Sequence, residues 1–392
     1  MRFPGRSPRA YNVPVTEAAY LDLIAGRTRG PWAAALRLGL LSASLPYGLA
    51  VRTRNRAFDL GLKPVHRAGA PVISVGNLTC GGTGKTPIVA DLCLRLQAGG
   101  RRPAALSRGY RSLEGEGAND EKLLLDALMP GVPQVQNPDR VAGAKLALQE
   151  HGADCLVLDD GFQHRRLGRD LDVALIDATA PFGPGSLRRP GCRGRVLPAG
   201  LLRESAAGLR RADLILLTRC DAITADERAA VESALTERAP GTPVVPVAFA
   251  PTALIDVAGA ARSLDGARGA RVGAFCGIGN PAGFRATLEG LGVDVATFEP
   301  RPDHHAHTPA DVAAIAQRAA DAGATALLCT EKDLVKLRTK TFAAASSTNP
   351  EPPLPIFAVR IAATYPQGDA ALTAALTKAA GSPVGGTNEG AM

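Results

Sequence analysis

Aromatic side chains are scarce in this chain of 392 residues, where they make up 4% of the sequence. Proteins that hold single-stranded nucleic acid without sequence preference stack bases on aromatic rings, so the scarcity argues against that class. The hydrophobic fraction is still 46%, which is enough for folded cores built mainly from Ala, Val and Leu. The net charge of +8 is compatible with an anionic partner, and equally with an arginine-rich composition that serves no partner.

Cysteine pairs of the C-x-x-C type, which bind zinc, are also missing. The seven cysteines are odd in number and far apart in the sequence, so we expect reduced and mostly buried thiols in a cytosolic protein. The segment MRFPGRSPRAYNVPVTEAAY lacks the apolar core of a secretory signal peptide.

The sequence also lacks an uninterrupted apolar run that is long enough to span a bilayer. Residues 31–50 are apolar overall, but Arg37 interrupts them and Pro46 is expected to break the helix. Arginines at alternate positions follow directly at residues 52–56. An interfacial helix with a basic collar and a buried amphipathic helix are equally good interpretations, and neither of them spans a membrane.

A glycine-rich turn between two apolar runs is the main positive signal, in VISVGNLTCGGTGKTPIV at residues 72–89. Strand, glycine loop and helix in this order are typical of a loop that binds the phosphates of a nucleotide. The Walker A consensus G-x-x-x-x-G-K-[ST] ends here in Gly84-Lys85-Thr86, although Thr79 replaces its first glycine. We expect Lys85 to bind the terminal phosphates and Thr86 to bind Mg²⁺. The predicted phosphate-binding residues are Gly81, Gly82, Thr83, Gly84, Lys85 and Thr86.

An acidic pair follows a second apolar strand in LVLDDGFQHRRL at residues 156–167. A carboxylate at the end of such a strand is typical of a Walker B site, where it reaches Mg²⁺. Successive strand residues point to opposite faces, so Asp159 and Asp160 should differ in role. One would address the metal while the other orients a water, Lys85 or the nucleophile; alternatively, one of them only caps the next helix. Both are predicted metal ligands, together with Thr86.

Three of the six histidines lie in RPDHHAHTPAD at residues 301–311. Zinc binding is one interpretation, but no cysteine and no H-E-x-x-H pattern accompanies them. A histidine paired with a carboxylate as a general base is favoured, because an imidazole titrates near working pH. A polar loop that ends in a helix cap at Thr308 is the remaining alternative.

Two signatures of GTPases are missing. LLTRCD at residues 216–221 has Thr218 and Arg219 where the guanine-reading N-K-x-D has Asn and Lys, and no D-x-x-G follows the acidic strand. Specific guanine recognition is therefore not expected. A switch or metallochaperone-type P-loop NTPase that acts on a protein partner is kept as the alternative to an enzyme with a small-molecule substrate.

Strand and helix patterns alternate from residue 71 to about residue 250, which is typical of a doubly wound, mainly parallel sheet. Small residues at 251–270 suggest a linker, and a second, smaller α/β unit follows. The predicted fold class is therefore α/β and P-loop NTPase-like. We expect a membrane-associating segment at 1–56, a nucleotide-binding domain at 57–255, a smaller domain at 265–380 and a flexible tail at 381–392.

Taken in order, these motifs resemble one family, tetraacyldisaccharide 4′-kinase of the lipid A pathway. The resemblance covers about residues 15 to 340 and rests on SVGNLTCGGTGKTP, SRGY, DDGFQHRRL, PFGPGSLRRPGCRGRVLPAGLLRE, LLTRCD, FCGIGNPAGF, PDHHAHT and CTEKDLVKL. It implies a lipid kinase that uses ATP and Mg²⁺ to phosphorylate the 4′-hydroxyl of a tetraacyl glucosamine disaccharide 1-phosphate, giving lipid IVA. It also implies two α/β/α domains with the site in the cleft between them, in a peripheral enzyme bound to an anionic membrane surface at the cytoplasmic face of the inner membrane. No nucleic acid and no obligate protein partner are expected.

The resemblance also implies roles for particular residues. The catalytic pair of the family is an Asp that follows SRGY and a His of the D-H-H segment, which correspond here to Asp120 and His304, with His305 as the alternative. Lys85 completes the predicted catalytic set. The family usually has an aromatic residue where this chain has His307. The predicted substrate-binding residues are Asn77, Arg108, Gln163, His164, Arg188 and Arg189, and further cations suited to an anionic lipid are Arg193, Arg195 and Arg203.

Overall fold

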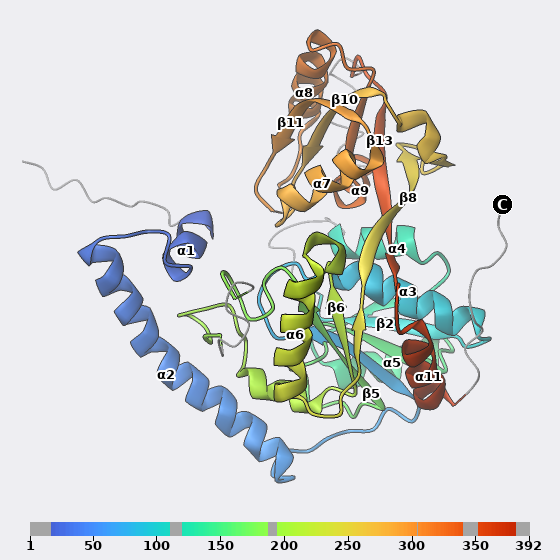
Figure 1. The fold of residues 1–392 in the computed structure, drawn as a ribbon. Helices are drawn as coiled ribbons and strands as arrows, with labels where there is room; N and C mark the ends of the chain where they lie inside the picture. The colour runs from blue at the N-terminus through green and yellow to red at the C-terminus, as the bar shows by residue number, and fades with distance from the viewer. Residues whose placement is uncertain (1–16, 110–119, 187–193, 304, 340–351, 382–392) are drawn as a thin grey trace, which may run out of the picture.

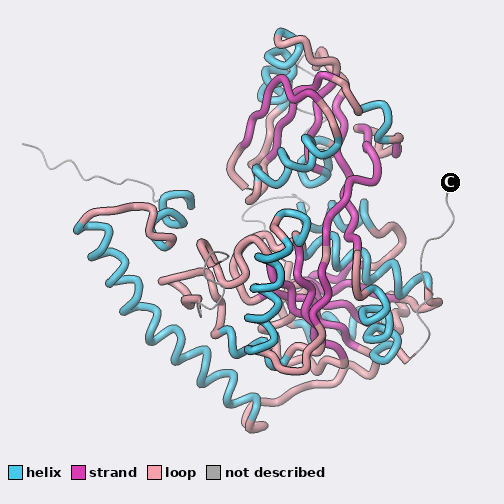
Figure 2. Tube along the Cα trace, viewed as in Figure 1, coloured by secondary structure: helices cyan, strands magenta, loops and turns pink. Residues whose placement is uncertain are grey.

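A computed structural model describes residues 17–109, 120–186, 194–303, 305–339 and 352–381. The described chain forms two α/β lobes joined by a two-stranded ribbon, with a long helix along one flank of the larger lobe (Figure 1). Figure 2 shows how the strands of each lobe lie between helices.

The larger lobe contains a seven-stranded sheet whose strands are all parallel, in the order β3-β2-β4-β1-β5-β6-β7. The strands are β1 Val72–Asn77, β2 Pro103–Ser107, β3 Gln134–Gln136, β4 Cys155–Asp159, β5 Leu171–Asp177, β6 Leu214–Thr218 and β7 Val244–Pro246. The helices are α3 Lys85–Ala98, α4 Asp120–Leu128, α5 Arg140–Glu150 and α6 Ala225–Arg238, with the 3-10 helices η1 Ala206–Arg211 and η2 Cys220–Ala222. This arrangement confirms the predicted doubly wound, mainly parallel fold.

Both faces of this sheet are covered, which explains why its central strands are apolar at nearly every position. On β4, Val157 belongs to the core formed with α3 and α4, whereas Leu156 and Leu158 belong to the core formed with α5. Strand β1 lies between β4 and β5, and all of its residues are buried. Because β1 and β4 are parallel neighbours, their carboxyl ends open side by side at one edge of the sheet.

The smaller lobe contains a six-stranded mixed sheet in the order β11-β10-β12-β13-β8-β9. The strands are β8 Ala248–Asp256, β9 Ala261–Arg262, β10 Arg271–Cys276, β11 Asp294–Pro300, β12 Ala326–Thr330 and β13 Ile356–Thr364. The helices are α7 Pro281–Leu291, α8 Pro309–Asp321 and α9 Glu331–Leu337, with the 3-10 helix η3 Leu264–Ala267. Strands β10 to β13 pair in parallel, whereas β8 and β9 pair antiparallel, so the predicted second α/β unit is confirmed.

Strands β8 and β13 pair antiparallel and carry the chain between the lobes (Figure 1). Residues 251–270, expected to be a linker, therefore include the end of β8 and the short β9, because pairing satisfies their backbone groups. Helix α11, Asp369–Ala380, falls within the range expected for the smaller domain, yet its Leu372 and Leu376 lie in the core of the larger lobe with Ile73. The chain thus leaves the larger lobe through β8 and returns to it through β13.

Helices α1 Glu17–Ile24 and α2 Pro31–Asp59 precede the first strand. Helix α2 continues through Pro46, so the expected break is wrong: a proline removes one intrahelical hydrogen bond, and the turns on either side hold this helix together. By length and composition α2 could cross a membrane, and 6% of its most apolar stretch is buried, which excludes the interpretation of a buried helix. Its exposed large apolar side chains are Trp32, Leu36, Leu38, Leu41, Leu45 and Leu49.

Candidate active site

The phosphate loop connects β1 to α3 and is held in shape from behind by Asn77. This side chain is fully buried, and its amide group donates hydrogen bonds to Thr79 O at 2.8 Å and to Thr83 Oγ1 at 3.1 Å. Gly84 ends the loop with φ 81°, a left-handed conformation that favours glycine. Asn77 is buried and holds the loop in shape through these hydrogen bonds, and its predicted substrate contact stays a prediction.

The LLTRCD segment supports the same loop from another side. Thr218 Oγ1 donates a hydrogen bond to Thr83 O at 3.0 Å, and Arg219 Nη2 donates one to Gly82 O at 2.7 Å. Arg219 has a left-handed backbone with φ 60°, and an ion pair with Asp177 fixes its guanidinium group. The sequence predicted no structural role for this motif; the structure shows that it contacts the phosphate loop from behind.

Lys85 begins α3 and reaches the acidic turn that follows β4. Its Nζ lies 2.9 Å from Asp160 Oδ1 and 3.2 Å from Asn77 Oδ1. Arg203 Nη1 lies 2.7 Å from both carboxylate oxygens of Asp160. Burial raises the pKa of Asp160, but Lys85 and Arg203 outweigh it and hold that pKa below its usual value. An ionised carboxylate between two cations therefore lies beside the phosphate loop.

Asp159, the last residue of β4, has a different environment. It is 8% exposed, and its Oδ1 has no hydrogen-bond partner within the described part of the chain. Burial raises its pKa to about 6, and Lys85 offsets that rise only in part. Asp160 follows with a left-handed φ of 56°. The strand ends between the two residues, and their carboxyl groups have different surroundings.

Glycines allow the acidic turn to lie directly on β1. A Cβ at Gly76 would lie 2.7 Å from Phe162 N, and a Cβ at Gly161 would lie 2.7 Å from Ser74 Oγ. Both distances are too short for a side chain, so glycine is needed for the close approach of the two segments. The phosphate loop and the acidic pair are therefore placed relative to each other by backbone packing.

Gln163 connects the acidic turn to Glu204, a buried carboxylate that sequence reasoning missed. Gln163 Nε2 donates hydrogen bonds to Asn77 O at 3.0 Å and to Glu204 Oε1 at 3.1 Å. Glu204 is 2% exposed and also accepts hydrogen bonds from Asn55 of α2 and from Arg211. The C-terminal part of α2 is thus linked through side chains to the phosphate loop.

His164 is half-buried beside several arginines. Burial, and then Arg140 and its neighbours, lower the pKa of His164 to about 4, so the ring is neutral at pH 7. Arg108 follows β2 at the same sheet edge and is exposed. Arg188 and Arg189 lie outside the described residues, and their predicted substrate contacts stay predictions.

The predicted catalytic residue Asp120 begins α4 and faces the smaller lobe. Its Oδ2 lies 3.5 Å from Nζ of Lys336 on α9. The same ammonium group donates a hydrogen bond to His305 O at 3.1 Å. His304 lies outside the described residues. The structure therefore brings Asp120 to the histidine segment of the other lobe through Lys336, which sequence reasoning did not single out.

His307 is enclosed in the smaller lobe, with its side chain fully buried. Its ring contacts Phe275 edge-on with the ring centroids 5.0 Å apart, and its Nε2 lies 3.4 Å from Asp333 Oδ1. It thus packs as an aromatic residue does, which is the residue type usual at this position in the resembled family. Within the described ranges no group of three or more His, Cys, Asp or Glu side chains could hold a metal ion, so the zinc interpretation gains no support.

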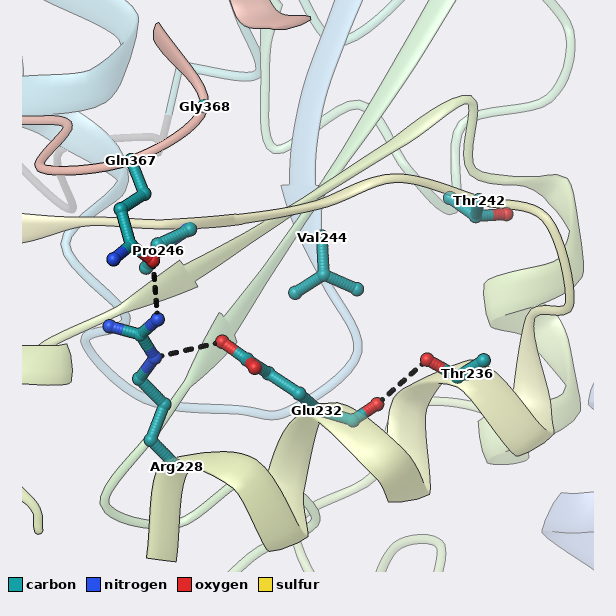
Figure 3. A pocket seen from close by; sticks show the side chains of 8 residues that line it. All are labelled: Arg228, Glu232, Thr236, Thr242, Val244, Pro246, Gln367 and Gly368. Atoms are coloured by element: carbon teal, nitrogen blue, oxygen red, sulfur yellow. Dashed lines mark hydrogen bonds and ion pairs between the residues drawn. The ribbon is translucent and has the colours of Figure 1, made fainter. Parts of the chain in front are cut away.

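A pocket of about 300 Å³ lies between α6, β7 and the turn before α11 (Figure 3). Arg228 pairs here with Glu232 on the same helix and with Gln367 of the turn before α11 (Figure 3). No residue of the phosphate loop or the acidic turn lines this pocket. It is therefore separate from the predicted site.

The fold and the phosphate-loop geometry define an α/β enzyme of the P-loop NTPase type. The model of the tetraacyldisaccharide-1-P 4′-kinase family matches residues 36–380. The tetraacyldisaccharide 4′-kinase of Anaeromyxobacter dehalogenans strain 2CP-C is 43% identical over 344 residues, which cover 83% of this chain and 88% of the relative. The tetraacyldisaccharide 4′-kinase of Geobacter metallireducens is 41% identical over 319 residues, which cover 77% of this chain and 89% of the relative.

A crystal structure of LpxK from Aquifex aeolicus in complex with ATP is 30% identical, has a TM-score of 0.67, and covers 88% of this chain and 99% of that one. This chain therefore belongs to the tetraacyldisaccharide 4′-kinase family. It is a kinase of the lipid A pathway that uses ATP and Mg²⁺, as the resemblance implied.

Proposed function

We propose that this kinase phosphorylates the 4′-hydroxyl of its tetraacyl disaccharide 1-phosphate at the carboxyl edge of the larger sheet, where the smaller lobe completes the site. The observation that carries the proposal is the convergence of Lys85 and Arg203 on Asp160 beside the phosphate loop. Phosphoryl transfer depends on positioning and charge stabilisation more than on covalent chemistry of the protein. Two cations fixed by one carboxylate meet that need.

Asp159 and Thr86 would hold Mg²⁺. Asp159 Oδ1 is buried without a partner among the described residues, and burial raises the pKa of this carboxyl group to about 6, so a cation there would compensate a costly charge. Thr86 follows Lys85 directly, as the metal-binding hydroxyl of a Walker A loop does. When bound, the ion compensates charge on the phosphate oxygens. Asp160, already paired with Lys85 and Arg203, has the role of orienting Lys85.

Asp120 and His304 would together accept the proton of the 4′-hydroxyl. The imidazole takes this proton on a ring nitrogen while the hydroxyl oxygen bonds to the γ-phosphorus of ATP and the bond from that phosphorus to the bridging oxygen breaks, releasing ADP. The carboxylate keeps the ring in one tautomer. The contact of Asp120 with Lys336, which also binds the backbone of His305, supports this pairing. His305 is the alternative base; burial and the nearby His307 lower its pKa, which favours a neutral, proton-accepting ring.

Helix α2 would attach the enzyme to an anionic membrane surface at the cytoplasmic face of the inner membrane. Its apolar side chains are exposed, and Arg52 and Arg56 lie at a pocket that Leu49 and Leu60 also line. Apolar side chains followed by a basic collar favour an interfacial position. Tyr47 Oη of α2 donates a hydrogen bond to the backbone oxygen of Arg203, whose side chain pairs with Asp160. Helix α2 and the site are therefore neighbours.

Transfer of label from the γ-phosphate of ATP to a purified tetraacyl disaccharide 1-phosphate in micelles tests the proposal. We expect turnover that depends on the lipid, and a loss of about a hundredfold or more in kcat for Lys85→Ala. Lys122→Ala, whose side chain is exposed on α4 beside Asp126, is the matched control and should keep full activity. ATP hydrolysis that requires an added protein in place of the lipid would favour a switch NTPase.

A further inference from the structure

The segment CTEKDLVKL, residues 329–337, buries a lysine. Lys336 on α9 is 8% exposed. Its Nζ lies 3.1 Å from His305 O, 3.5 Å from Asp120 Oδ2 and 3.6 Å from Asp333 Oδ1. A lysine is rarely buried unless it is paired, because taking an ammonium group out of water is costly. Oxygens from three separate segments of the chain compensate this cation.

Asp333 is the partner that holds Lys336 from within the smaller lobe, and its own carboxylate is fixed by hydrogen bonds. Its carboxylate accepts hydrogen bonds from Gly277 N at 3.1 and 3.0 Å and from Thr330 Oγ1 at 2.6 Å. Burial raises the pKa of Asp333, but the nearby His307 and these hydrogen bonds outweigh it and hold the pKa below its usual value. Asp333 is therefore ionised at neutral pH, and it holds the ammonium group from the side of the smaller lobe.

Asp120 approaches the same ammonium group from the larger lobe. It begins α4, and α4 packs against α9. Lys336 therefore contacts both parts of the proposed base: the carboxylate of Asp120, and the backbone of His305, the residue that follows His304. Asp120 and His305 are far apart in the sequence and belong to different lobes, so their relative position depends on such contacts.

We propose that Lys336 is a positioning residue that fixes the Asp120 carboxylate relative to the segment that carries His304. The inference rests on the proposed role of Asp120 in accepting the proton. A general base must lie within hydrogen-bond reach of the proton it accepts, and a displacement of about 1 Å costs about a hundredfold in rate. By binding Asp120 through Oδ2, the ammonium group sets the orientation of that carboxylate.

Lys336→Met tests the inference, because methionine keeps an apolar stem in the same space but removes the charge. We expect kcat for lipid phosphorylation to fall about a hundredfold. The KM for ATP, and the affinity for a fluorescent ATP analogue, should stay within about twofold, because the phosphate loop is untouched. Lys336→Arg keeps a cation and should retain a larger share of kcat than Lys336→Met. The matched control is Lys122→Met on α4, whose ammonium group pairs with Asp126 and which should change none of these values.

A double variant distinguishes positioning from an independent contribution. Lys336→Met should cost little in an Asp120→Asn background, because two groups that act as a unit are not additive. The positioning role is overturned if the losses multiply, if the KM for lipid rises while kcat is unchanged, or if Lys336→Arg is as inactive as Lys336→Met and equally lowered in Tm. Full activity of Asp120→Asn would overturn the proposed base together with the positioning role. If Asp120→Asn loses activity while Lys336→Met keeps the kcat of the wild type, only the positioning role is overturned.

Discussion

Replacing Asp159 by Asn should make the protein more stable at neutral pH, although it removes a proposed Mg²⁺ ligand. Burial raises the pKa of this carboxyl group from 3.8 to about 6, so the folded state binds the proton more tightly than the unfolded state does. Above pH 6 the folded protein must carry a buried carboxylate whose Oδ1 has no partner among the described residues. The difference between 3.8 and about 6 corresponds to about 3 kcal/mol of lost stability at pH 7.5.

The pH dependence of this effect has a definite sign. Well below pH 3.8 the carboxyl group is protonated in both states and the penalty vanishes. Between pH 3.8 and about 6 the folded state binds more protons than the unfolded state, so the free energy of unfolding falls as the pH rises. We expect Asp159→Asn to stabilise by at most about 3 kcal/mol at pH 7.5 and by about 1 kcal/mol at pH 4.5. The buried amide group of Asn subtracts from both values, because it too must leave water.

Thermal unfolding without nucleotide or metal measures this difference. At pH 7.5 the variant should unfold at a Tm higher by on the order of 5 °C, and the gain should shrink towards pH 4.5. Asp160→Asn is the matched contrast: Lys85 and Arg203 keep the pKa of Asp160 low, so removing its charge leaves two cations unpaired and should lower the Tm. A variant Asp159→Asn that is no more stable than wild type at pH 7.5, or whose gain does not depend on pH, would refute the reasoning.

Three further predictions concern the loop, the base and the helix. Gly84→Ala places a Cβ 2.5 Å from the Phe249 ring on a backbone with φ 81°, so the KM for ATP should rise about tenfold in steady-state assays. Asp120→Ala and His304→Ala should each lower kcat about a hundredfold with little change in the KM for ATP, and the double variant should be no worse than either single one. Leu38→Glu adds a charge to a side chain that is 65% exposed on α2, and it should weaken binding to vesicles of anionic lipid about tenfold while turnover in micelles persists.

Each of these predictions has a control within the chain. Gly290→Ala on α7, where the added Cβ meets no atom within 4 Å, should keep the affinity for ATP. His305→Ala should retain most of the activity that His304→Ala loses; the reverse order would assign the base to His305. Val257→Glu, on a side chain that is 52% exposed in the smaller lobe, should leave vesicle binding unchanged. Equal loss of vesicle binding in both glutamate variants would mean that α2 is not the attachment surface.

The phosphate-loop part of the fold could be predicted because its determinants are local. Strand, glycine loop and helix follow one another within residues 72–89, and each has its own pattern. The return of α11 could not be predicted, since its apolar face suits either sheet and only the contacts of Leu372 and Leu376 with Ile73 decide between them. Strand β8, whose last residues form the beginning of the expected linker, depends in the same way on distant pairing with β13.

The site shows the same division between local and distant determinants. Lys85, Asp159 and Asp160 belong to motifs whose chemistry can be inferred from spacing. Arg203 was predicted only as one of several cations, and its role depends on the backbone contact that brings its segment to the phosphate loop, where Arg203 N donates a hydrogen bond to Leu78 O at 2.7 Å. The role of Lys336 depends on contact between two lobes, for which a single sequence has no signal.

The two carboxyl groups of the acidic pair are adjacent in the chain, yet their surroundings move their pKa values in opposite directions. Titratable groups whose pKa values are shifted apart by their surroundings commonly have different roles in a reaction. Asp160 is compensated by Lys85 and Arg203 before any nucleotide binds, so these cations are already fixed where charge develops during phosphoryl transfer. Asp159 lacks such compensation, and a bound divalent cation would supply it. The function therefore lowers folding stability at Asp159 and not at Asp160. For this reason Asp159→Asn should raise the Tm, whereas Asp160→Asn should lower it.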